Sequence, residues 1–221
     1  PYTTLFRSVA LAGGFDSFPE LKREQYFAAN SKGELFLETL MRYGNRYQAD
    51  KAAAVNSLFG GENVIDVATP EIPQGVERWS DLDRLNRERD LVGIYLSAHP
   101  LDEFSIVLEH VCNTRMSELE DKAALAGREI TMGGIVTSVR RGVSKNGNPY
   151  GIAKIEDYSG STEIPFWGND WVTYQGYLNE GTFLYIKARC QAKQWRQDEL
   201  EVKITSMELL PDVKEELVRR S

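Results

Sequence analysis

The sequence has 221 residues, of which 42% are hydrophobic and 27% charged, with a formal net charge of −7. This length allows one large or two ordinary domains, and the composition is typical of a globular chain rather than a disordered or membrane-bound one. No apolar run reaches the roughly eighteen residues of a membrane span, and no secretion signal is recognisable. We therefore expect a cytoplasmic protein with no membrane partner.

Few residues in this chain are of the types that carry chemistry. Cys112 and Cys190 are far apart and form no CxxC pair, which indicates two reduced thiols. His99 and His110 are the only histidines, and their spacing is not that of zinc ligands. A lone histidine before a proline, as at His99, more often packs or caps than catalyses. With no P-loop or nucleophile elbow either, we predict no catalytic residue, no metal site and no cofactor in this chain.

Both ends of the sequence resemble cut ends. Pro1–Ser8 (PYTTLFRS) is similar to the translation of a common sequencing-adapter oligonucleotide, and we exclude these residues from the fold prediction. Residues 211–221 stop without a closing element and are interpreted as the start of a truncated tail. We expect the chain to be a piece of a longer protein.

The first half of the chain is predicted to be helical. Residues 9–59 contain a helix over Glu20–Ala29, introduced by Pro19, and an amphipathic stretch, Glu34–Tyr47, that Asp50–Asn56 could continue. Residues 60–78 are rich in glycine and proline, which indicates a linker. Residues 79–127 form a second helical segment, which Pro100 divides into helices over Trp79–Leu96 and Leu101–Val111.

From residue 128 the pattern changes to strands separated by turn residues. The predicted strands are Glu129–Arg141, with a bulge at Gly133-Gly134, and then Tyr150–Asp157, Thr162–Trp167, Thr182–Gln194 and Leu200–Leu210. A short helix, Trp171–Leu178, follows the third strand, with Asn169 or Asp170 as its cap. Three strands, a helix and two strands are the order of an OB-fold. The predicted fold class is α+β, with an N-terminal helical region followed by a five-stranded OB-fold β-barrel over residues 128–210.

The charge is spread unevenly between these regions. Residues 1–127 hold 13 basic and 20 acidic side chains, which accounts for the whole net charge. Residues 128–210 are neutral, with ten basic and ten acidic side chains. A neutral module can bind nucleic acid only with modest affinity, and only if its cations are clustered.

The cations and aromatic residues of the predicted barrel are arranged as single-strand binding requires. Alternation in the fourth strand puts Leu184, Ile186, Ala188 and Cys190 in the core and aromatic and basic residues on the other face. Further cations lie on the two loops that flank the groove of OB-folds. Aromatic rings stack on bases, and cations follow phosphates. The predicted nucleic-acid-binding residues are Arg140, Arg141, Lys145, Lys154, Trp167, Phe183, Tyr185, Lys187, Arg189, Lys193, Trp195 and Arg196.

Ordinary roles compete with this interpretation. Each cation taken singly is more often a solvated surface residue. Phe183 and Tyr185 could equally pack against a neighbouring domain.

Three segments resemble one known family. LVGIYLSAHPLDEF (Leu91–Phe104) is similar to the end of the polymerase core of bacterial replicative DNA polymerase III alpha subunits. VTSVRRGVSKNGNPYGIAKIEDYSGSTEIPFW (Val136–Trp167) is similar to the start of the OB domain that follows it there, and ALAGGFDSF (Ala10–Phe18) to the exit of its helix-hairpin-helix element. The first two motifs are specific and the third is less so.

The resemblance implies a piece of a template-directed DNA polymerase whose OB domain contacts single-stranded template. It also implies that the catalytic aspartates of this Mg-dependent enzyme lie in a palm domain outside the sequence. The other replicase subunits would then bind through regions that are missing here.

A further partner implied by the resemblance is the sliding clamp. VNSLFG (Val55–Gly60) falls where the family carries an internal clamp-binding motif, and Ser57, Leu58 and Phe59 are the predicted clamp-binding residues. Val55 departs from the family pattern, which usually has glutamine there. Alternatively, Leu58 and Phe59 belong to a local core.

Two other function classes stay open. One is a stand-alone OB-fold module that binds tRNA or single-stranded DNA and is not part of an enzyme. The other is a protein-interaction scaffold that uses the exposed aromatic residues of the barrel.

Overall fold

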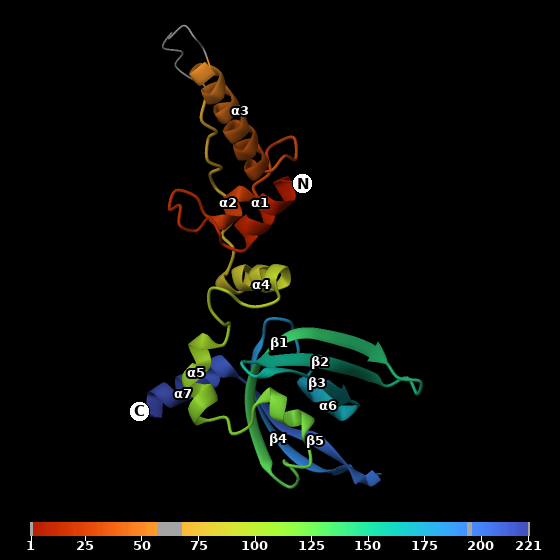
Figure 1. The fold of residues 1–221 in the computed structure, drawn as a ribbon. Coiled ribbons are helices and arrows are strands. Elements are labelled where there is room, and N and C mark those ends of the chain that lie inside the picture. Colours follow the sequence, from red (N-terminus) through yellow and green to blue (C-terminus); the bar gives the residue numbers. More distant parts are fainter. Residues whose placement is uncertain (1, 57–67, 194–195, 221) are drawn as a thin grey trace. The chain divides into compact units, whose positions relative to one another are not determined.

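The computed structural model of this chain describes residues 2–56, 68–193 and 196–220 (Figure 1). It divides into two compact units, Pro1–Ala98 and His99–Ser221, which we call the N-terminal unit and the barrel unit. The helical segment predicted over residues 79–127 is therefore split between the two units. Within the described residues, no helix combines the length and the apolar character needed to cross a membrane.

The N-terminal unit is helical, as predicted. Its helices are α1 (Tyr2–Leu11), α2 (Arg23–Tyr26), α3 (Phe36–Asn56) and α4 (Asp81–Val92). A small core forms around Ala10, Tyr26 and Leu37, with Phe15, Leu21, Phe27 and Leu40 packed against it. Helix α1 begins within Pro1–Ser8, the segment that we left out of the fold prediction.

The ends of these helices differ from the predicted ones. The helix predicted over Glu20–Ala29 is reduced to α2, because Ala29 pairs with Leu35 in a β-bridge and leaves the helical conformation. The stretches predicted as Glu34–Tyr47 and Asp50–Asn56 join into the single helix α3. Helix α4 starts after Ser80, whose hydroxyl accepts a hydrogen bond of 3.1 Å from the backbone N–H of Asp83.

A buried ion pair joins α2 to α4. The guanidinium of Arg23 donates to Glu88 at 2.6 Å and to Asp16 at 2.6 Å, and the Glu88 side chain has no exposed surface. Glu88 also accepts hydrogen bonds from the hydroxyl (2.6 Å) and the backbone N–H (3.0 Å) of Ser97. Burial alone would raise the pKa of Glu88, but the bonds from Ser97 and Arg23 outweigh it and lower this pKa below 4.5. The sequence pattern did not predict this ion pair.

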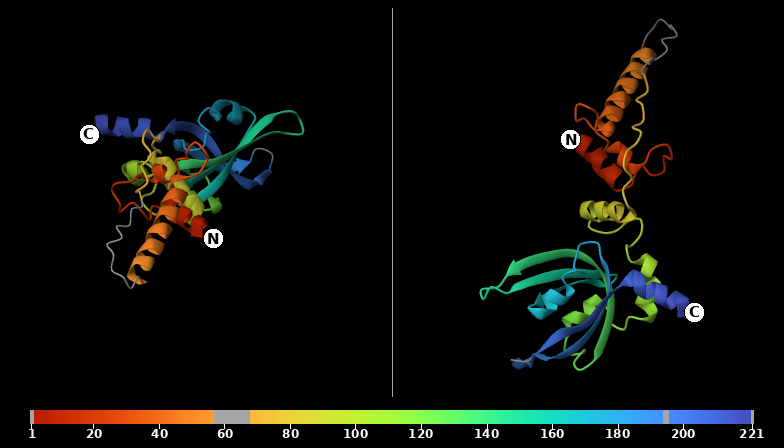
Figure 2. Two further views of the ribbon diagram at one scale, coloured as in Figure 1. Left: turned by 90° about the horizontal axis from the view of Figure 1, so that it is seen from above. Right: turned by 180° about the vertical axis from the view of Figure 1, so that it is seen from behind.

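The barrel unit contains the five strands that the sequence predicts, in one antiparallel sheet. They are β1 (Glu129–Val143), β2 (Pro149–Asp157), β3 (Gly160–Trp167), β4 (Phe183–Lys193) and β5 (Arg196–Leu209). Their order in the sheet is β3-β2-β1-β4-β5, and Figure 2 shows how the sheet curls into a barrel. The predicted fold class, α+β with a helical region followed by an OB-fold barrel, is confirmed.

Strand β1 is the central strand and changes partner along its length. Residues 129–135 pair with β4 and residues 135–143 with β2, with a shift of register between Val136 and Ser138. The bulge predicted at Gly133-Gly134 therefore lies a few residues later. Gly133 has a different role: a side chain there would collide with Leu108, so the glycine lets the chain before the barrel pack directly on β1.

The interior of the barrel follows the predicted alternation. Leu184, Ile186, Ala188 and Cys190 are buried, as are Ile164 and Phe166 of β3. Burial raises the pKa of the Cys190 thiol, which suits an unreactive core residue. The core is completed by residues from β1, β2 and the flanking helices, among them Met132, Val136, Ile155, Trp171 and Leu178.

Short helices surround the barrel. They are η1 (Asp102–Phe104), α5 (Ser105–His110), η2 (Met116–Glu120), α6 (Asn169–Tyr174) and α7 (Leu210–Arg220). The helix predicted over Leu101–Val111 is thus broken into η1 and α5, and the predicted tail 211–221 is mostly the helix α7. The cap of α6 is Gly168, with no side-chain hydrogen bond, rather than Asn169 or Asp170. Helices α5 and α7 lie side by side (Figure 2).

The chain before the barrel is anchored on the turn between β2 and β3. The hydroxyl of Tyr158 donates to Asp102 at 2.7 Å, and the same carboxylate accepts the backbone N–H of His99 at 2.9 Å. The bond from Tyr158 lowers the pKa of Asp102. The ring of His99 lies 4.5 Å from that of Tyr158, so this histidine occupies the packing position that the sequence predicts.

Candidate nucleic-acid interface

Strands β1, β2 and β3 present alternate side chains on the outer surface of the barrel. At one end the register pairs Tyr150 with Trp167, and four residues further along β2 it pairs Lys154 with Glu163. Because two residues of a strand span about 6.6 Å, these two rows lie about 13 Å apart. We call this surface the binding face; it consists of Ser138, Arg140, Gly142, Tyr150, Ile152, Lys154, Glu163, Pro165 and Trp167.

The aromatic end of the binding face consists of Tyr150 and Trp167. Their ring centroids are 4.6 Å apart, and 54% of the Trp167 surface is exposed. A side chain at Gly142 would come within 2.8 Å of the Tyr150 ring, so this glycine makes room for the ring to lie over β1. The pair offers an open ring on which an unpaired base can stack.

The sequence prediction included Trp167 but missed Tyr150. The signal was present, because Gly151, Ala153 and Ile155 alternate as inward-facing residues and leave Tyr150 facing outward with Lys154.

The charged end of the binding face consists of Arg140, Lys154 and Glu163. A guanidinium nitrogen of Arg140 lies 2.6 Å from a carboxylate oxygen of Glu163, and both side chains are more than half exposed. Lys154 stands directly opposite Glu163 in the register. Two predicted cations therefore share one surface with the aromatic pair, together with a carboxylate.

A groove of about 630 Å³ continues the binding face from β3 towards β5. Trp167 and Glu163 line it from β3, and Lys193 and Lys203 line it from β4 and β5. Of its three lysines, Lys122, Lys193 and Lys203, the last two are paired with carboxylates. Lys193 pairs with Glu199, and Lys203 pairs with Asp170 at 2.6 Å. The groove thus adjoins the exposed ring of Trp167 but carries little net charge, because its three lysines face three carboxylates, Glu163, Asp170 and Glu201.

The loop between β1 and β2 contributes less than predicted. Lys145 is exposed in the turn at the tip of the hairpin. Arg141 points to the other side of β1, where it donates to the carbonyl of Leu178 at 3.3 Å and lies 5.9 Å from the ring of Trp171. Arg141 thus faces away from Arg140, because neighbouring residues of a strand face opposite sides, and its contact with nucleic acid stays a prediction.

The aromatic residues of β4 do not belong to an exposed interface. The ring of Phe183 packs 4.9 Å from that of Phe104 in η1, and Tyr185 is only 5% exposed. The packing alternative for these two residues is therefore the one found, with the covering residues supplied by the same chain. Burial raises the pKa of Tyr185.

The cations of β4 lie on this second surface as well. Lys187 is 3.3 Å from Glu208 of β5, and its ammonium group lies 5.5 Å from the ring centroid of Tyr185. Arg189 is exposed and stands between Glu129 and Lys203 in the register. Phe183 and Tyr185 therefore do not share an exposed surface with Lys187 and Arg189, and nucleic-acid binding by these two cations stays a prediction.

Several predicted residues cannot be placed. Trp195 lies outside the described residues. Only the backbone of Arg196 is described; it is the first residue of β5 and pairs with Lys193 of β4. The predicted clamp-binding residues Ser57, Leu58 and Phe59 also lie outside the described residues.

Comparisons with known proteins agree with the OB-fold of the barrel unit. Residues 130–210 match a family model for an OB-fold nucleic acid binding domain of the tRNA anticodon type. The DNA polymerase III alpha subunit of Pasteurella multocida is 29% identical over 184 residues, covering 83% of this chain and 15% of the relative. That of Mycobacterium leprae is 27% identical over 186 residues, covering 82% of this chain and 15% of the relative. The resemblance to DNA polymerase III alpha subunits is confirmed.

The similarity to DNA polymerase III alpha subunits covers both units but only part of the relatives. The chain spans about 15% of the length of the alpha subunits that it matches. Among solved structures, the mitochondrial single-stranded DNA binding protein Rim1 of S. cerevisiae is 16% identical, with a TM-score of 0.28 over 38% of this chain and 96% of that chain. A score this low says nothing about the ligand.

The segments that resemble DNA polymerase III alpha subunits meet in the barrel unit. His99 and Asp102 belong to the first motif, and Tyr158, which they contact, belongs to the second. Leu91, Val92, Ile94 and Leu96 of the first motif lie in the N-terminal unit and are exposed. The motif thus connects the two units and anchors its second half on the barrel.

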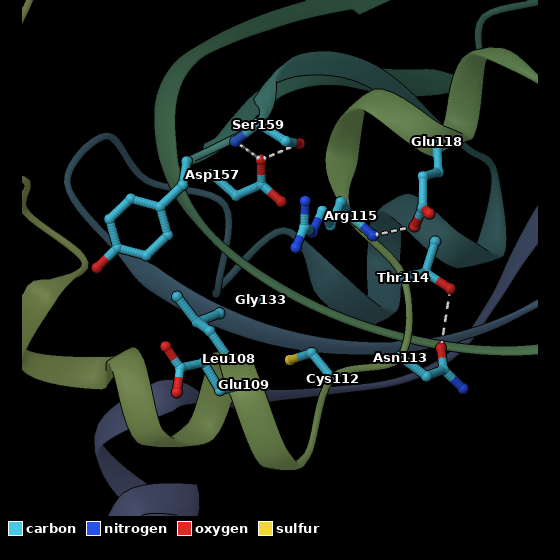
Figure 3. Close-up of a pocket in the computed structure, with 11 residues that line it drawn as sticks. Leu108, Glu109, Cys112, Asn113, Thr114, Arg115, Glu118, Gly133, Asp157 and Ser159 are labelled. Atoms are coloured by element: carbon cyan, nitrogen blue, oxygen red, sulfur yellow. Dashed lines mark hydrogen bonds between the residues drawn. The ribbon is translucent and has the colours of Figure 1, made fainter.

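A second cavity in the barrel unit, of about 560 Å³, is less suited to nucleic acid (Figure 3). Its lining includes the carboxylates of Glu109, Glu118 and Asp157 and a single cation, Arg115. Asp157 is already bound to the backbone N–H (2.7 Å) and hydroxyl (2.6 Å) of Ser159. Its acidic lining would repel phosphates.

Cys112 lies in this second cavity, in surroundings that disfavour its thiolate form. Burial, with a smaller effect of the Asp157 charge, raises its pKa to about 12. The thiol is therefore protonated at neutral pH. Within the described part of the chain, no cluster of His, Cys, Asp or Glu is arranged to hold a metal ion.

Proposed function

We propose that this chain is a segment of the alpha subunit of a bacterial replicative DNA polymerase, and that its barrel binds single-stranded template DNA through the binding face. The observation that carries the proposal is the aromatic pair Tyr150 and Trp167 on the same surface as the cations Arg140 and Lys154. The similarity to alpha subunits supports the identity of the longer protein.

The chemistry of the binding face favours an unpaired strand. An exposed ring can stack on a base only if that base is free of its partner, and the neighbouring cations can follow the backbone. No base-specific contact is needed, so the barrel would hold template of any sequence. Template-directed synthesis itself would be carried out by the longer protein, in the cytoplasm.

The charge balance limits the affinity. Arg140, Lys193 and Lys203 each pair with a carboxylate of the barrel unit, so a bound phosphate must compete with these anions. We infer that the barrel guides a strand that other parts of the replicase hold in place.

The test is a titration of labelled single-stranded DNA with the 221-residue protein, in which fluorescence anisotropy measures binding at several salt concentrations. Affinity should fall as salt rises, and Arg140→Ala and Lys154→Ala should each flatten the log–log slope by about 0.7, the value for one phosphate contact on a single strand. Lys187→Ala, on the surface of β4, is the matched control and should leave the slope unchanged.

Two results would contradict the proposal. One is the absence of binding at low salt. The other is equal loss in all three variants, which would indicate attraction to net charge rather than to the binding face.

The family model also covers tRNA anticodon domains, so a stand-alone tRNA-binding module is the second candidate. Folded tRNA should compete with labelled single-stranded DNA only poorly if the chain is part of a DNA polymerase. A clear preference for tRNA would favour the second candidate.

We further propose that Val55–Gly60 contacts the sliding clamp, on the sequence evidence of Leu58 and Phe59. A peptide with this sequence should bind purified clamp in a calorimetric titration, and Phe59→Ala should abolish the binding because it removes the apolar anchor. Val55→Gln, which restores the usual family residue, should strengthen it. No binding by either parent or Val55→Gln peptide would refute this contact.

A further inference from the structure

The ion pair between Arg140 and Glu163 occupies the middle of the charged end of the binding face. Its two charged atoms are 2.6 Å apart, and Lys154 faces the same carboxylate across the β2–β3 pairing. Of the two cations that the proposed function assigns to the DNA backbone, Glu163 thus pairs with Arg140 and stands opposite Lys154 in the register. Exposure of 66% for Arg140 and 52% for Glu163 leaves both accessible to a ligand.

Carboxylates and phosphates are the two anions that a guanidinium binds with paired, charge-assisted hydrogen bonds. A carboxylate that pairs with one of these cations and has the other as its cross-strand neighbour therefore marks a position where a phosphate fits as well. Resting on the proposed function, we propose that Glu163 is an internal stand-in for a backbone phosphate. In the free protein it fills a phosphate subsite formed by Arg140 and Lys154, and a bound strand displaces it.

This assignment fixes where the strand touches the face. Lys154 and Glu163 lie about 13 Å along the strands from the row of Tyr150 and Trp167, so the stacked base and the bound phosphate belong to different nucleotides. Each phosphate that enters must replace an existing ion pair, and each one that leaves is replaced by Glu163. The exchange lowers affinity and favours rapid movement of the strand across the face.

The test is the isosteric variant Glu163→Gln in the same 221-residue protein. An exposed ion pair contributes up to about 1 kcal/mol, so removal of the competitor should tighten binding of single-stranded DNA by about two- to five-fold at low salt. Glu208→Gln is the matched control. It removes the same charge from an exposed pair with Lys187, on the surface of β4, and should change affinity less than two-fold.

A second background separates the subsite from general charge effects. In Arg140→Ala/Lys154→Ala the subsite is gone, and Glu163→Gln should then give no gain. An equal gain from Glu163→Gln and Glu208→Gln would overturn the inference, as would a gain that persists in the double-alanine background. Weaker binding by Glu163→Gln would overturn it too.

Failure of this inference is distinct from failure of the proposed function. If the unmodified protein binds single-stranded DNA but Glu163→Gln has no effect, only the phosphate subsite is wrong. If the unmodified protein does not bind at all, the proposed function fails, and the subsite with it.

Discussion

Glu88→Gln should destabilise the N-terminal unit by about 3–5 kcal/mol, the cost of breaking a buried ion pair by removing one partner. The substitution keeps the shape of the side chain but removes the fully buried counter-charge of Arg23, which then keeps its ion pair with Asp16, a carboxylate that is 48% exposed. Arg23 is 6% exposed, so water cannot take the place of the carboxylate. The Ser97 hydrogen bonds would weaken at the same time, because a neutral amide is a poorer acceptor.

Urea denaturation, monitored by hydrogen exchange on peptides of the N-terminal unit, would measure this loss of stability separately from the stability of the barrel unit. Asp90→Asn is the matched control on the same helix. Asp90 is 73% exposed and lies 3.7 Å from Arg89, so its substitution should cost less than about 0.5 kcal/mol. Similar losses in the two variants would contradict the role of the buried pair.

The same pair predicts a direction for pH dependence. The pKa of Glu88 is lower in the folded protein than its ordinary value of 4.5, so the unfolded chain binds the proton more tightly. The contribution of Glu88 to stability is therefore complete above pH 4.5 and is lost as the pH falls below it. Glu88→Gln should lack this part of the acid response.

Trp167→Ala should weaken binding of single-stranded DNA by about 5- to 150-fold, which corresponds to 1–3 kcal/mol for one stacked base. Trp167 is 54% exposed, so its removal takes away the stacking surface without opening the barrel core. Trp167→Phe should keep most of the affinity, because it keeps a ring over which a base can lie. Anisotropy titrations at low salt would measure the affinity of each variant for single-stranded DNA.

Tyr177→Ala removes another partly exposed aromatic residue of the barrel unit, one that is not part of the binding face. It should bind like the unmodified protein. If the affinity of Trp167→Ala is within two-fold of that of the unmodified protein, the aromatic pair is not the stacking site. The proposal then loses the observation that carries it. Circular dichroism would verify that each variant is folded.

Local patterns determined most of the architecture. The order of strands and the short helix identified the barrel, since period-two alternation and turn residues are properties of neighbouring residues. The same patterns placed the helices but not their ends. The helix predicted over Glu20–Ala29 was shortened by the pairing of Ala29 with Leu35, a contact that propensity does not encode.

Glu88 shows a limit of pattern reading. It lies three residues after Leu85 and so falls on the buried stripe of α4, where an apolar residue is expected. A glutamate is rarely fully buried unless it is paired. Its partner, Arg23, is 65 residues away in the chain, and only the folded unit brings them together.

The sequence alone determined the fold class, the inward-facing residues of β4 and the resemblance to DNA polymerase III alpha subunits, because each depends on neighbouring residues or on motifs read in order. It also predicted Arg140, Lys154 and Trp167 as nucleic-acid-binding residues, which stays a prediction. Only the tertiary structure decided which outward-facing residues stay exposed. Alternation shows that a side chain leaves the core but not what covers it. Phe183 and Tyr185 of β4 face outward yet are covered, since Phe104, far earlier in the chain, packs there. Tyr150 instead meets Trp167 on the open face.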